Sequence, residues 1–277
     1  MTRISRCFAN LRGEGRAALI AYLTAGDPCL AKTLSLVGAL ERGGADLIEL
    51  GVPFSDPIAD GPVIQRASER ALAQGASLRK VIGLAREIRR SSEIPILLFT
   101  YLNPVLRYGI EALARDAVDA GIDGCLLTDL SVEEAAGYVL AMRGHGLDTV
   151  FLAAPTSTPE RLRLVAEYST GFVYLVSRTG VTGEQTSLSE AILPLVNSMR
   201  GITELPLAVG FGISRPEHAA AVGAIADGVV VGSAFVRLIE RHSDDPELDR
   251  MLESLARQLA GALPRRARRE PAEGNNG

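Results

Sequence analysis

Residues 44–62, GADLIELGVPFSDPIADGP, contain the unit that decides how this chain folds. A glycine at position 44 and Asp46 come first, then the apolar run 47–50, which Glu49 interrupts, and then a long loop with three prolines. Glycine often ends a helix by taking a left-handed conformation, and a short apolar run indicates a buried strand. The stretch therefore predicts a helix end, a buried strand and a shaped loop, in that order.

The joint between helix and strand recurs along the chain. It reads Gly44-Ala-Asp46, Gly121-Ile-Asp123-Gly and Ala226-Asp227-Gly228, each directly before an apolar run. Eight such runs predict strands at residues 18–24, 46–51, 96–101, 124–128, 149–154, 172–177, 207–211 and 229–232. Helical patterns separate or follow them at residues 31–42, 63–74, 78–90, 110–120, 132–143, 159–167, 189–199, 215–222 and 246–263. Strict alternation with short links predicts a parallel sheet, and eight repeats predict a closed (β/α)8 barrel. An open, doubly wound sheet is the alternative.

Length and composition fit one such domain. The chain has 277 residues, of which 47% are hydrophobic and 22% charged, which is enough for a buried core. Barrels of this size are commonly single domains. We expect a barrel domain over residues 1–263, with an extra helix near residues 4–12 covering the bottom of the barrel. The tail, residues 264–277, is rich in Arg, Glu, Gly and Asn and is expected to be disordered.

Several classes of protein do not fit. The formal net charge is −4, and the one basic cluster lies in the tail at Arg265, Arg266, Arg268 and Arg269, so we interpret it as a solvated end and not as a nucleic-acid site. No apolar run reaches the ~18 residues of a membrane span, and the polar N-terminus has no apolar core of a signal peptide. Cys7, Cys29 and Cys125 form no CxxC pair, which favours reduced thiols in a cytoplasmic protein.

Two carboxylates stand out near the first strand–loop unit. Glu49 interrupts an apolar strand, where it must lose its water. Desolvation raises a carboxyl pKa, which suits proton transfer; an exposed strand end or an arginine partner would explain Glu49 equally well. Asp60 lies in the loop just before a predicted helix, so it is either a helix cap or a second chemical group.

Glycine-rich turns follow the last three predicted strands. They are RTGVTG at residues 178–183, VGFGIS at residues 209–214 and VGSA at residues 231–234, and a short helix is expected at residues 234–240. Barrels often bind phosphate with the loops after strands 7 and 8 and a short helix N-terminus. These turns therefore favour a phosphate site over tight turns alone.

The residues that are scarce narrow the chemistry. The two lysines, Lys32 and Lys80, fall in helical patterns, which disfavours a Schiff-base aldolase. The three histidines form no HxH or HxxxH spacing, so a catalytic metal is not expected. What remains is carboxylates, tyrosines and backbone dipoles, which suit proton transfer on a substrate that supplies its own electron sink.

The chain resembles the tryptophan synthase alpha subunits. The resemblance runs in order and in register from about residue 4 to about residue 260. It is strongest in ELGVPFSDPIADGPVIQRA at 49–67, YLNPVLRYG at 101–109, YLVSRTGVTG at 174–183 and VGFGIS at 209–214. The resemblance implies retro-aldol cleavage of indole-3-glycerol phosphate into indole and D-glyceraldehyde 3-phosphate, with indole as the electron sink.

The same resemblance implies roles for individual residues. Glu49 would protonate indole C3 and assist the glycerol hydroxyl, and Asp60 would accept from the indole N–H. The implied substrate-binding residues are Tyr22, Phe99, Leu126, Tyr174, Thr182, Phe211 and Val230. The implied phosphate-binding residues are Gly183, Gly212, Gly232 and Ser233. Without the resemblance, Phe99, Leu126 and Val230 would be read as ordinary barrel core.

The resemblance also implies an assembly. The family subunit works with a pyridoxal-phosphate β subunit in an α2β2 heterotetramer, carries no cofactor itself, and would use Asp56 as its likeliest contact with β. Two positions depart from familiar members: Tyr22 adds a hydroxyl that needs a partner, and Ser131 replaces a frequent proline. Neither touches the two carboxylates.

Three other functions remain open from sequence. One is a catalytically silent α-like barrel that only activates β, although the chain keeps both Glu49 and Asp60. A second is a stand-alone lyase that releases indole without a β partner. The third is a different phosphate-sugar isomerase or aldolase on the same barrel. The scarcity of lysine and histidine disfavours this function.

Overall fold

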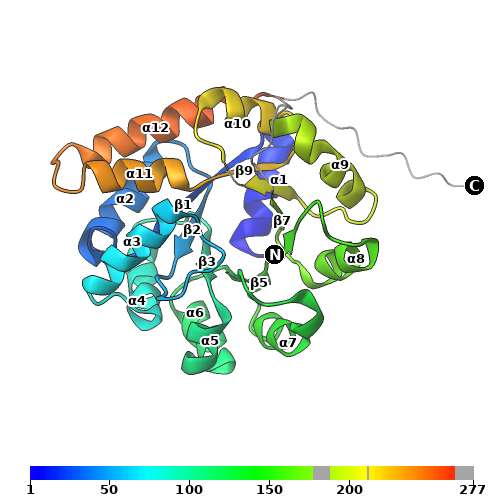
Figure 1. Cartoon of the computed structure of the whole chain (residues 1–277), viewed down its shortest axis with the longest axis horizontal. Helices are drawn as coiled ribbons and strands as arrows, with labels where there is room; N and C mark the ends of the chain where they lie inside the picture. Colours follow the sequence, from blue (N-terminus) through cyan, green and yellow to red (C-terminus); the bar gives the residue numbers. More distant parts are fainter. Residues whose placement is uncertain (177–187, 211, 266–277) are drawn as a thin grey trace, which may run out of the picture.

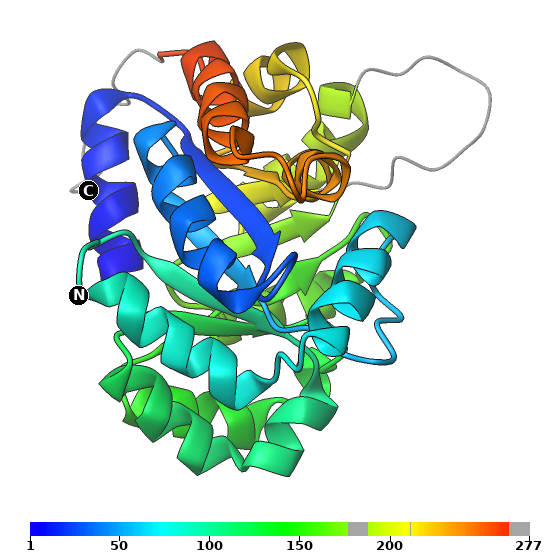
Figure 2. The same cartoon turned by 90° about the vertical axis from the view of Figure 1, so that its left-hand side faces the viewer.

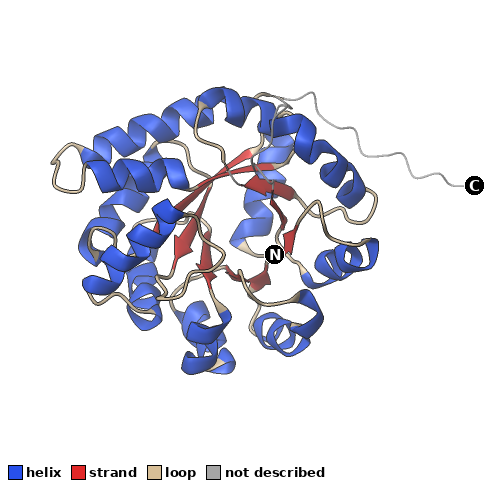
Figure 3. Ribbon diagram, viewed as in Figure 1, coloured by secondary structure: helices blue, strands red, loops and turns tan. Residues whose placement is uncertain are grey.

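The computed structural model describes residues 1–176, 188–210 and 212–265, and the side chains of residues 188–191 are not described. Figure 1 looks onto a ring of strands with helices around it, and Figure 3 shows the same arrangement by element type. The strands are β1 (Ala18–Thr24), β2 (Leu47–Gly51), β3 (Ile96–Thr100), β4 (Gly124–Leu127), β5 (Asp148–Thr149), β6 (Leu152–Ala153), β7 (Val173–Val176), β8 (Leu207–Gly210) and β9 (Gly228–Val231). All of their pairings are parallel.

The sheet closes on itself through β5 and β6. The spatial order is β5-β4-β3-β2-β1-β9-β8-β7-β6, so these two segments lie at the two ends of the order although they are consecutive in the chain. Between them, the N–H of Val150 donates to the carbonyl of Cys125 on one side at 3.3 Å, and Phe151 accepts from Tyr174 on the other at 3.1 Å. The predicted strand 149–154 is therefore two segments, and together they complete the barrel. The open-sheet alternative is wrong.

The helices follow the predicted alternation with two corrections. They are α1 (Arg3–Glu14), α2 (Leu30–Arg42), α3 (Pro62–Ala73), α4 (Leu78–Arg89), α5 (Leu102–Tyr108), α6 (Ile110–Asp119), α7 (Ala136–Gly144), α8 (Pro159–Tyr168), α9 (Leu188–Arg200), α10 (Pro216–Gly223), α11 (Ser233–Arg241) and α12 (Leu248–Ala262). The predicted helix 132–143 is instead a 3₁₀ turn, Val132–Glu134, followed by α7. The structure also contains α5, a short helix of seven residues that was not predicted. None of the helices in the described part of the chain is long and apolar enough to span a bilayer.

Alternation along the strands divides the core into two layers. On β1, Leu19, Ala21 and Leu23 pack outward against the helices, whereas Ala18 and Ile20 belong to the cluster inside the barrel. The same alternation places Leu47 in the inner cluster, and Glu49, two residues later, points to the same face. Pairing sets Glu49 opposite Tyr22 on β1. The register thus sends the carboxyl group into the barrel.

Helix α1 fills the bottom of the barrel, as the sequence predicted. Its residues Ile4, Phe8 and Leu11 belong to the inner cluster, and the Phe8 ring lies 5.6 Å from that of Phe172. Figure 2 shows α1 beside the N-terminus, at the end of the barrel opposite the loop between β2 and α3. Because α1 occupies this end, ligands must enter from the other one.

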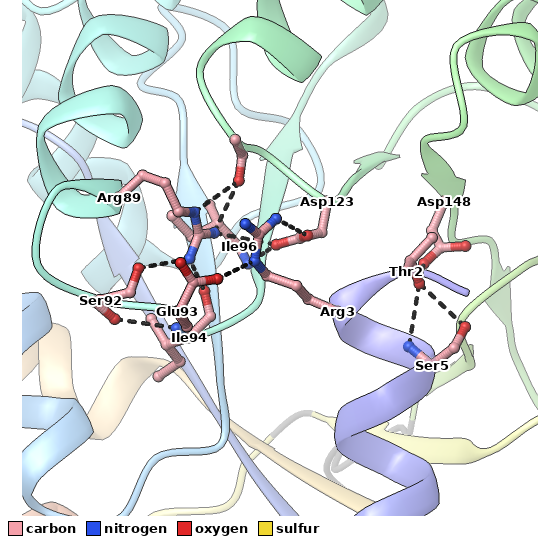
Figure 4. Close-up of polar contacts among 11 residues, drawn as sticks. Thr2, Arg3, Ser5, Arg89, Ser92, Glu93, Ile94, Ile96, Asp123 and Asp148 are labelled. Carbon is pink, nitrogen blue, oxygen red and sulfur yellow. Dashed lines mark hydrogen bonds and ion pairs between the residues drawn. The ribbon is translucent and has the colours of Figure 1, made fainter.

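Polar contacts fasten the start of α1 to the barrel (Figure 4). Arg3 donates to Glu93 at 2.7 Å and to Asp123 at 3.2 Å, and Asp123 is also contacted by Arg89 at 3.2 Å. Thr2 is the N-cap of α1, and its side chain accepts a hydrogen bond from the backbone N–H of Ser5. Arg3 and Arg89 thus both pair with the buried carboxylate of Asp123. These ion pairs offset the cost of removing its charge from water.

The repeated joint of the sequence has a structural explanation. Each joint places an aspartate at the start of one strand, where its side chain accepts from a backbone N–H of the neighbouring strand. The pairs are Asp46 with Leu19 at 2.8 Å, Asp123 with Ile96 at 2.8 Å and Asp227 with Leu207 at 2.9 Å. The repeat therefore satisfies backbone groups where adjacent strands begin.

The end of the chain is described only as far as residue 265. Arg265 forms an isolated antiparallel bridge with Arg16. The rest of the predicted disordered tail, residues 266–277, lies outside the described residues.

Candidate active site

A cavity of about 430 Å³ lies where the strands end. Its walls come from β1, β2, β3, β6, β7 and β9, from the segments that follow β2, β4, β8 and β9, and from α3 and α11. The lining residues are Tyr22, Glu49, Ala59, Asp60, Gly61, Ile64, Phe99, Thr128, Leu152, Tyr174, Val176, Gly212, Ile213, Ser214, Val230, Gly232, Ser233 and Arg237. Most of the described residues singled out from sequence meet here, although the chain spreads them over more than 200 positions.

Glu49 is an unpartnered acid in this cavity. Its side chain is fully buried, and within the described structure neither carboxylate oxygen has a hydrogen-bond partner. Burial raises the pKa of Glu49 to about 8. Glu49 therefore neither lies at an exposed strand end nor pairs with an arginine of the described chain, which were the two structural explanations of this residue. At neutral pH the group is mostly protonated.

Asp60 occupies a different environment. Gly61, not Asp60, is the N-cap of α3, so the helix-cap interpretation is wrong. The Asp60 carboxylate instead accepts a 2.9 Å hydrogen bond from the hydroxyl of Tyr101. Burial raises the pKa of Asp60 to about 6, and the hydrogen bond from Tyr101 opposes that rise. At neutral pH this carboxyl group is mostly ionised.

Tyr101 has a role in the site that was not predicted from the sequence. Its hydroxyl also accepts from the N–H of Ala59 at 3.1 Å, and its ring lies 5.2 Å from that of Phe54. It therefore holds the β2–α3 loop at three points. Its position indicated such a role, because Tyr101 directly follows β3 and the active sites of barrels lie at the C-terminal ends of the strands.

The apolar part of the cavity contains most of the predicted substrate-binding residues. Tyr22, Phe99, Tyr174 and Val230 line it, and the rings of Tyr22 and Phe99 meet edge to face at 5.2 Å. The Tyr22 hydroxyl has the partner it needs, because it lies 3.3 Å from Thr24 Oγ1. Leu126 belongs to the inner apolar cluster and does not line the cavity.

Two glycines make room for the two tyrosines. A Cβ atom at Gly51 would lie 2.7 Å from Cζ of Tyr22, and one at Gly210 would lie 2.5 Å from Cζ of Tyr174. Both distances are far below van der Waals contact, so a larger residue would push either ring out of place. The cavity wall thus depends on the absence of two side chains.

The far rim is suited to an anion. Gly232 is the N-cap of α11 and makes no side-chain cap, so the N–H groups of the first turn carry no capping side chain. Gly212 and Ser233 line the same rim, and Gly212 has a φ of 78°. Backbone N–H groups at a helix N-terminus favour a phosphate. The predicted short helix 234–240 is confirmed as α11.

Four other predicted site residues either lie outside the described part of the chain or do not line the cavity. Thr182, Gly183 and Phe211 are not among the described residues. Asp56 is exposed on the β2–α3 loop and does not line the cavity, and Ile58 beside it is 83% exposed. The described residues bring together no group of three or more His, Cys, Asp or Glu side chains able to hold a metal ion.

Known proteins resemble this chain in sequence and in fold. The family model for the tryptophan synthase alpha chain matches residues 8–263. A tryptophan synthase alpha chain of Solibacter usitatus is 66% identical over 267 residues, covering 96% of this chain and 100% of the relative. One from Geotalea uraniireducens is 51% identical, covering 94% of this chain and 98% of the relative. The crystal structure of tryptophan synthase subunit alpha from Legionella pneumophila superposes with a TM-score of 0.86 at 38% identity, covering 95% of this chain and 98% of that one.

Proposed function

The chain belongs to the tryptophan synthase alpha chain family, and from this premise we propose how its cavity cleaves indole-3-glycerol phosphate. It is a carbon–carbon lyase of tryptophan biosynthesis on a (β/α)8 barrel. The products are indole and D-glyceraldehyde 3-phosphate. We assign the catalytic domain to residues 1–263.

One observation carries the assignment of the catalytic residues: two carboxyl groups in one cavity have pKa values of about 8 and about 6. At neutral pH Glu49 can donate a proton while Asp60 accepts a hydrogen bond. Environments that push two carboxyl pKa values apart are typical of acid/base pairs. Desolvation separates them, because Glu49 has no polar partner among the described residues, whereas Asp60 has Tyr101.

The reaction then follows from these states. Glu49 protonates indole C3, and Asp60 accepts from the indole N–H, where positive charge develops. The bond between C3 and the glycerol chain breaks, and its electron pair returns to the indole ring. The Glu49 carboxylate then takes the proton of the glycerol hydroxyl as that carbon becomes the aldehyde. Proton and electron pair balance without a lysine or a metal.

Substrate binding is divided between the two ends of the cavity. We assign the indole to Tyr22, Phe99, Tyr174 and Val230, with Leu126 supporting them from the inner cluster. We assign the phosphate to Gly212, Gly232 and Ser233, which line the rim at the start of α11. Thr182, Phe211 and Gly183 are proposed for the same roles by resemblance alone.

An indole-release assay on the purified chain tests this function. Glu49→Gln and Asp60→Asn are each expected to lower kcat by about 10²–10⁴-fold, the usual contribution of general acid–base catalysis. Glu69→Gln, on the exposed face of α3, is the matched control and should keep wild-type activity. A wild-type chain that releases no indole, alone or with a β subunit, would identify a catalytically silent α-like protein instead.

We further propose a pyridoxal-phosphate β subunit as partner, in an α2β2 heterotetramer in the cytoplasm, with no cofactor in this subunit. Asp56 and Ile58 support a contact on the β2–α3 loop, because both are exposed on the loop that carries Asp60. Asp56→Ala should weaken activation by β and leave the slow cleavage by the isolated subunit intact. Equal loss in both assays would contradict this role, and failure to copurify with β would favour a stand-alone lyase.

A further inference from the structure

Helix α11 directs an arginine to the rim of the cavity. Arg237 lines the cavity together with Gly232 and Ser233. It lies four residues after Ser233, and residues at this spacing share one face of a helix. The side chain is exposed, so it stands between the phosphate rim and solvent.

Arg237 is also uncommitted. Two arginines of α3 face the same helix, and both are held by Glu240: Arg66 at 2.6 Å and Arg70 at 2.9 Å. Arg237 has no hydrogen bond or ion pair with any part of the chain that the structure describes. Its guanidinium is therefore available for a ligand.

The helix that carries Arg237 is fixed in place. Arg66 grips Glu240 with two hydrogen bonds, at 2.6 and 2.9 Å. Arg70 joins Glu240 to Asp27, a buried residue after β1, with two further bonds of 2.8 Å. These contacts tie α11 to α3 and to the β1 loop. Arg237 thus projects from a helix that polar contacts anchor to its neighbours.

The charges of the cavity favour a cation at this rim. The carboxylic acids that line the cavity are Glu49 and Asp60. A phosphate monoester adds between one and two negative charges of its own. The start of α11 supplies N–H donors but only a fraction of a positive charge. Of the described lining residues, Arg237 alone carries a full positive charge. A guanidinium matches phosphate oxygens in geometry as well as in charge.

We propose that Arg237 is a substrate-binding residue that captures the phosphate ester at the mouth of the cavity. The proposal rests on the function proposed above and adds the residue that recognises the charge of its substrate. Arg237 contacts the phosphate from the solvent side, while the backbone of α11 contacts it from within. Because an exposed ion pair is weak, its effect is on capture and affinity and not on the chemical step.

Steady-state kinetics of Arg237→Gln and Arg237→Lys test the proposal, with Arg241→Gln as the control of equal charge change on the same helix. Arg237→Gln should raise KM for indole-3-glycerol phosphate about 5- to 20-fold and change kcat less than about twofold. Arg237→Lys should recover most of the loss. Added salt should raise KM of the wild type more than that of Arg237→Gln.

Binding of the two products separates a phosphate contact from general damage to the cavity. By calorimetry, Arg237→Gln should weaken binding of D-glyceraldehyde 3-phosphate and leave binding of indole unchanged. Equal weakening of both, or a KM within twofold of wild type, would overturn the proposal while the lyase function stands. If the wild type cleaves no substrate, the function fails, and binding of D-glyceraldehyde 3-phosphate still tests Arg237.

Discussion

The hydroxyl of Tyr101 donates a hydrogen bond to the carboxylate of Asp60 at 2.9 Å. The same hydroxyl accepts one from the backbone N–H of Ala59, the residue before Asp60. One side chain of the barrel wall thus fixes both the position and the ionisation of an acid on a loop. The two residues are 41 positions apart in the chain.

Tyr101→Phe should move the acidic limb of the kcat/KM profile to higher pH. The hydrogen bond from Tyr101 lowers the pKa of Asp60 against the effect of burial, so its loss lets that pKa rise above about 6. Since Asp60 must be ionised to accept from the indole N–H, activity near pH 6 should fall several-fold while activity near pH 8 changes little. Tyr108→Phe, which removes a similar contact to Asp116 at the surface, should leave the limb in place. An unmoved limb in Tyr101→Phe would refute the role of the contact.

Glu49→Gln should stabilise the fold at alkaline pH although it lowers activity. The unfolded carboxyl ionises near 4.5 and the folded one near 8, so between these values the native state binds more protons and stability falls as pH rises. The substitution removes this loss, which amounts to about 5 kcal/mol at most, reached above pH 8. Denaturant unfolding at pH 5 and pH 9 measures it. Glu69→Gln should give no such pH-dependent difference, and an equal effect of Glu49→Gln at both pH values would show that Glu49 does not titrate as described.

Gly210→Ala should damage the cavity without unfolding the barrel. The added Cβ would meet Cζ of Tyr174 at 2.5 Å, so the ring must shift toward the indole position. We expect kcat/KM to fall roughly tenfold or more and the free energy of unfolding to fall by about 1–3 kcal/mol. Gly137→Ala, in α7 with open space around it, is the matched control and should be neutral or slightly stabilising. Wild-type kcat/KM in Gly210→Ala would mean that the Tyr174 ring is not constrained.

Arg70→Met should destabilise the protein by about 3 kcal/mol, because it leaves the carboxylate of Asp27 buried without its charge partner. The double variant Asp27→Asn/Arg70→Met should lose less than the sum of the two single changes. Urea unfolding of all four proteins gives the coupling between the residues. Arg66→Met, whose side chain is half exposed, should have little effect. Additive losses would contradict a direct Asp27–Arg70 contact.

Local pattern was enough to predict the barrel. The alternation of apolar runs and helical segments, and the aspartate joints before strands, depend on nearest neighbours in the chain, so they can be read from it. The position of Glu49 within an apolar strand likewise indicated a desolvated acid. The prediction failed where local signals compete: α5 is too short to stand out, and the strand at 149–154 is interrupted where it changes partner between β4 and β7.

The sequence by itself determined that β2 carries an acid among apolar residues, and that a loop with a second acid follows it. Only the tertiary structure decided what each acid contacts. Asp60 and Tyr101 meet because β2 and β3 are paired neighbours, and Arg237 reaches the rim because Glu240 anchors α11 to α3. Protonation and binding depend on distances between atoms that chain order does not specify, since strand register and helix packing set them.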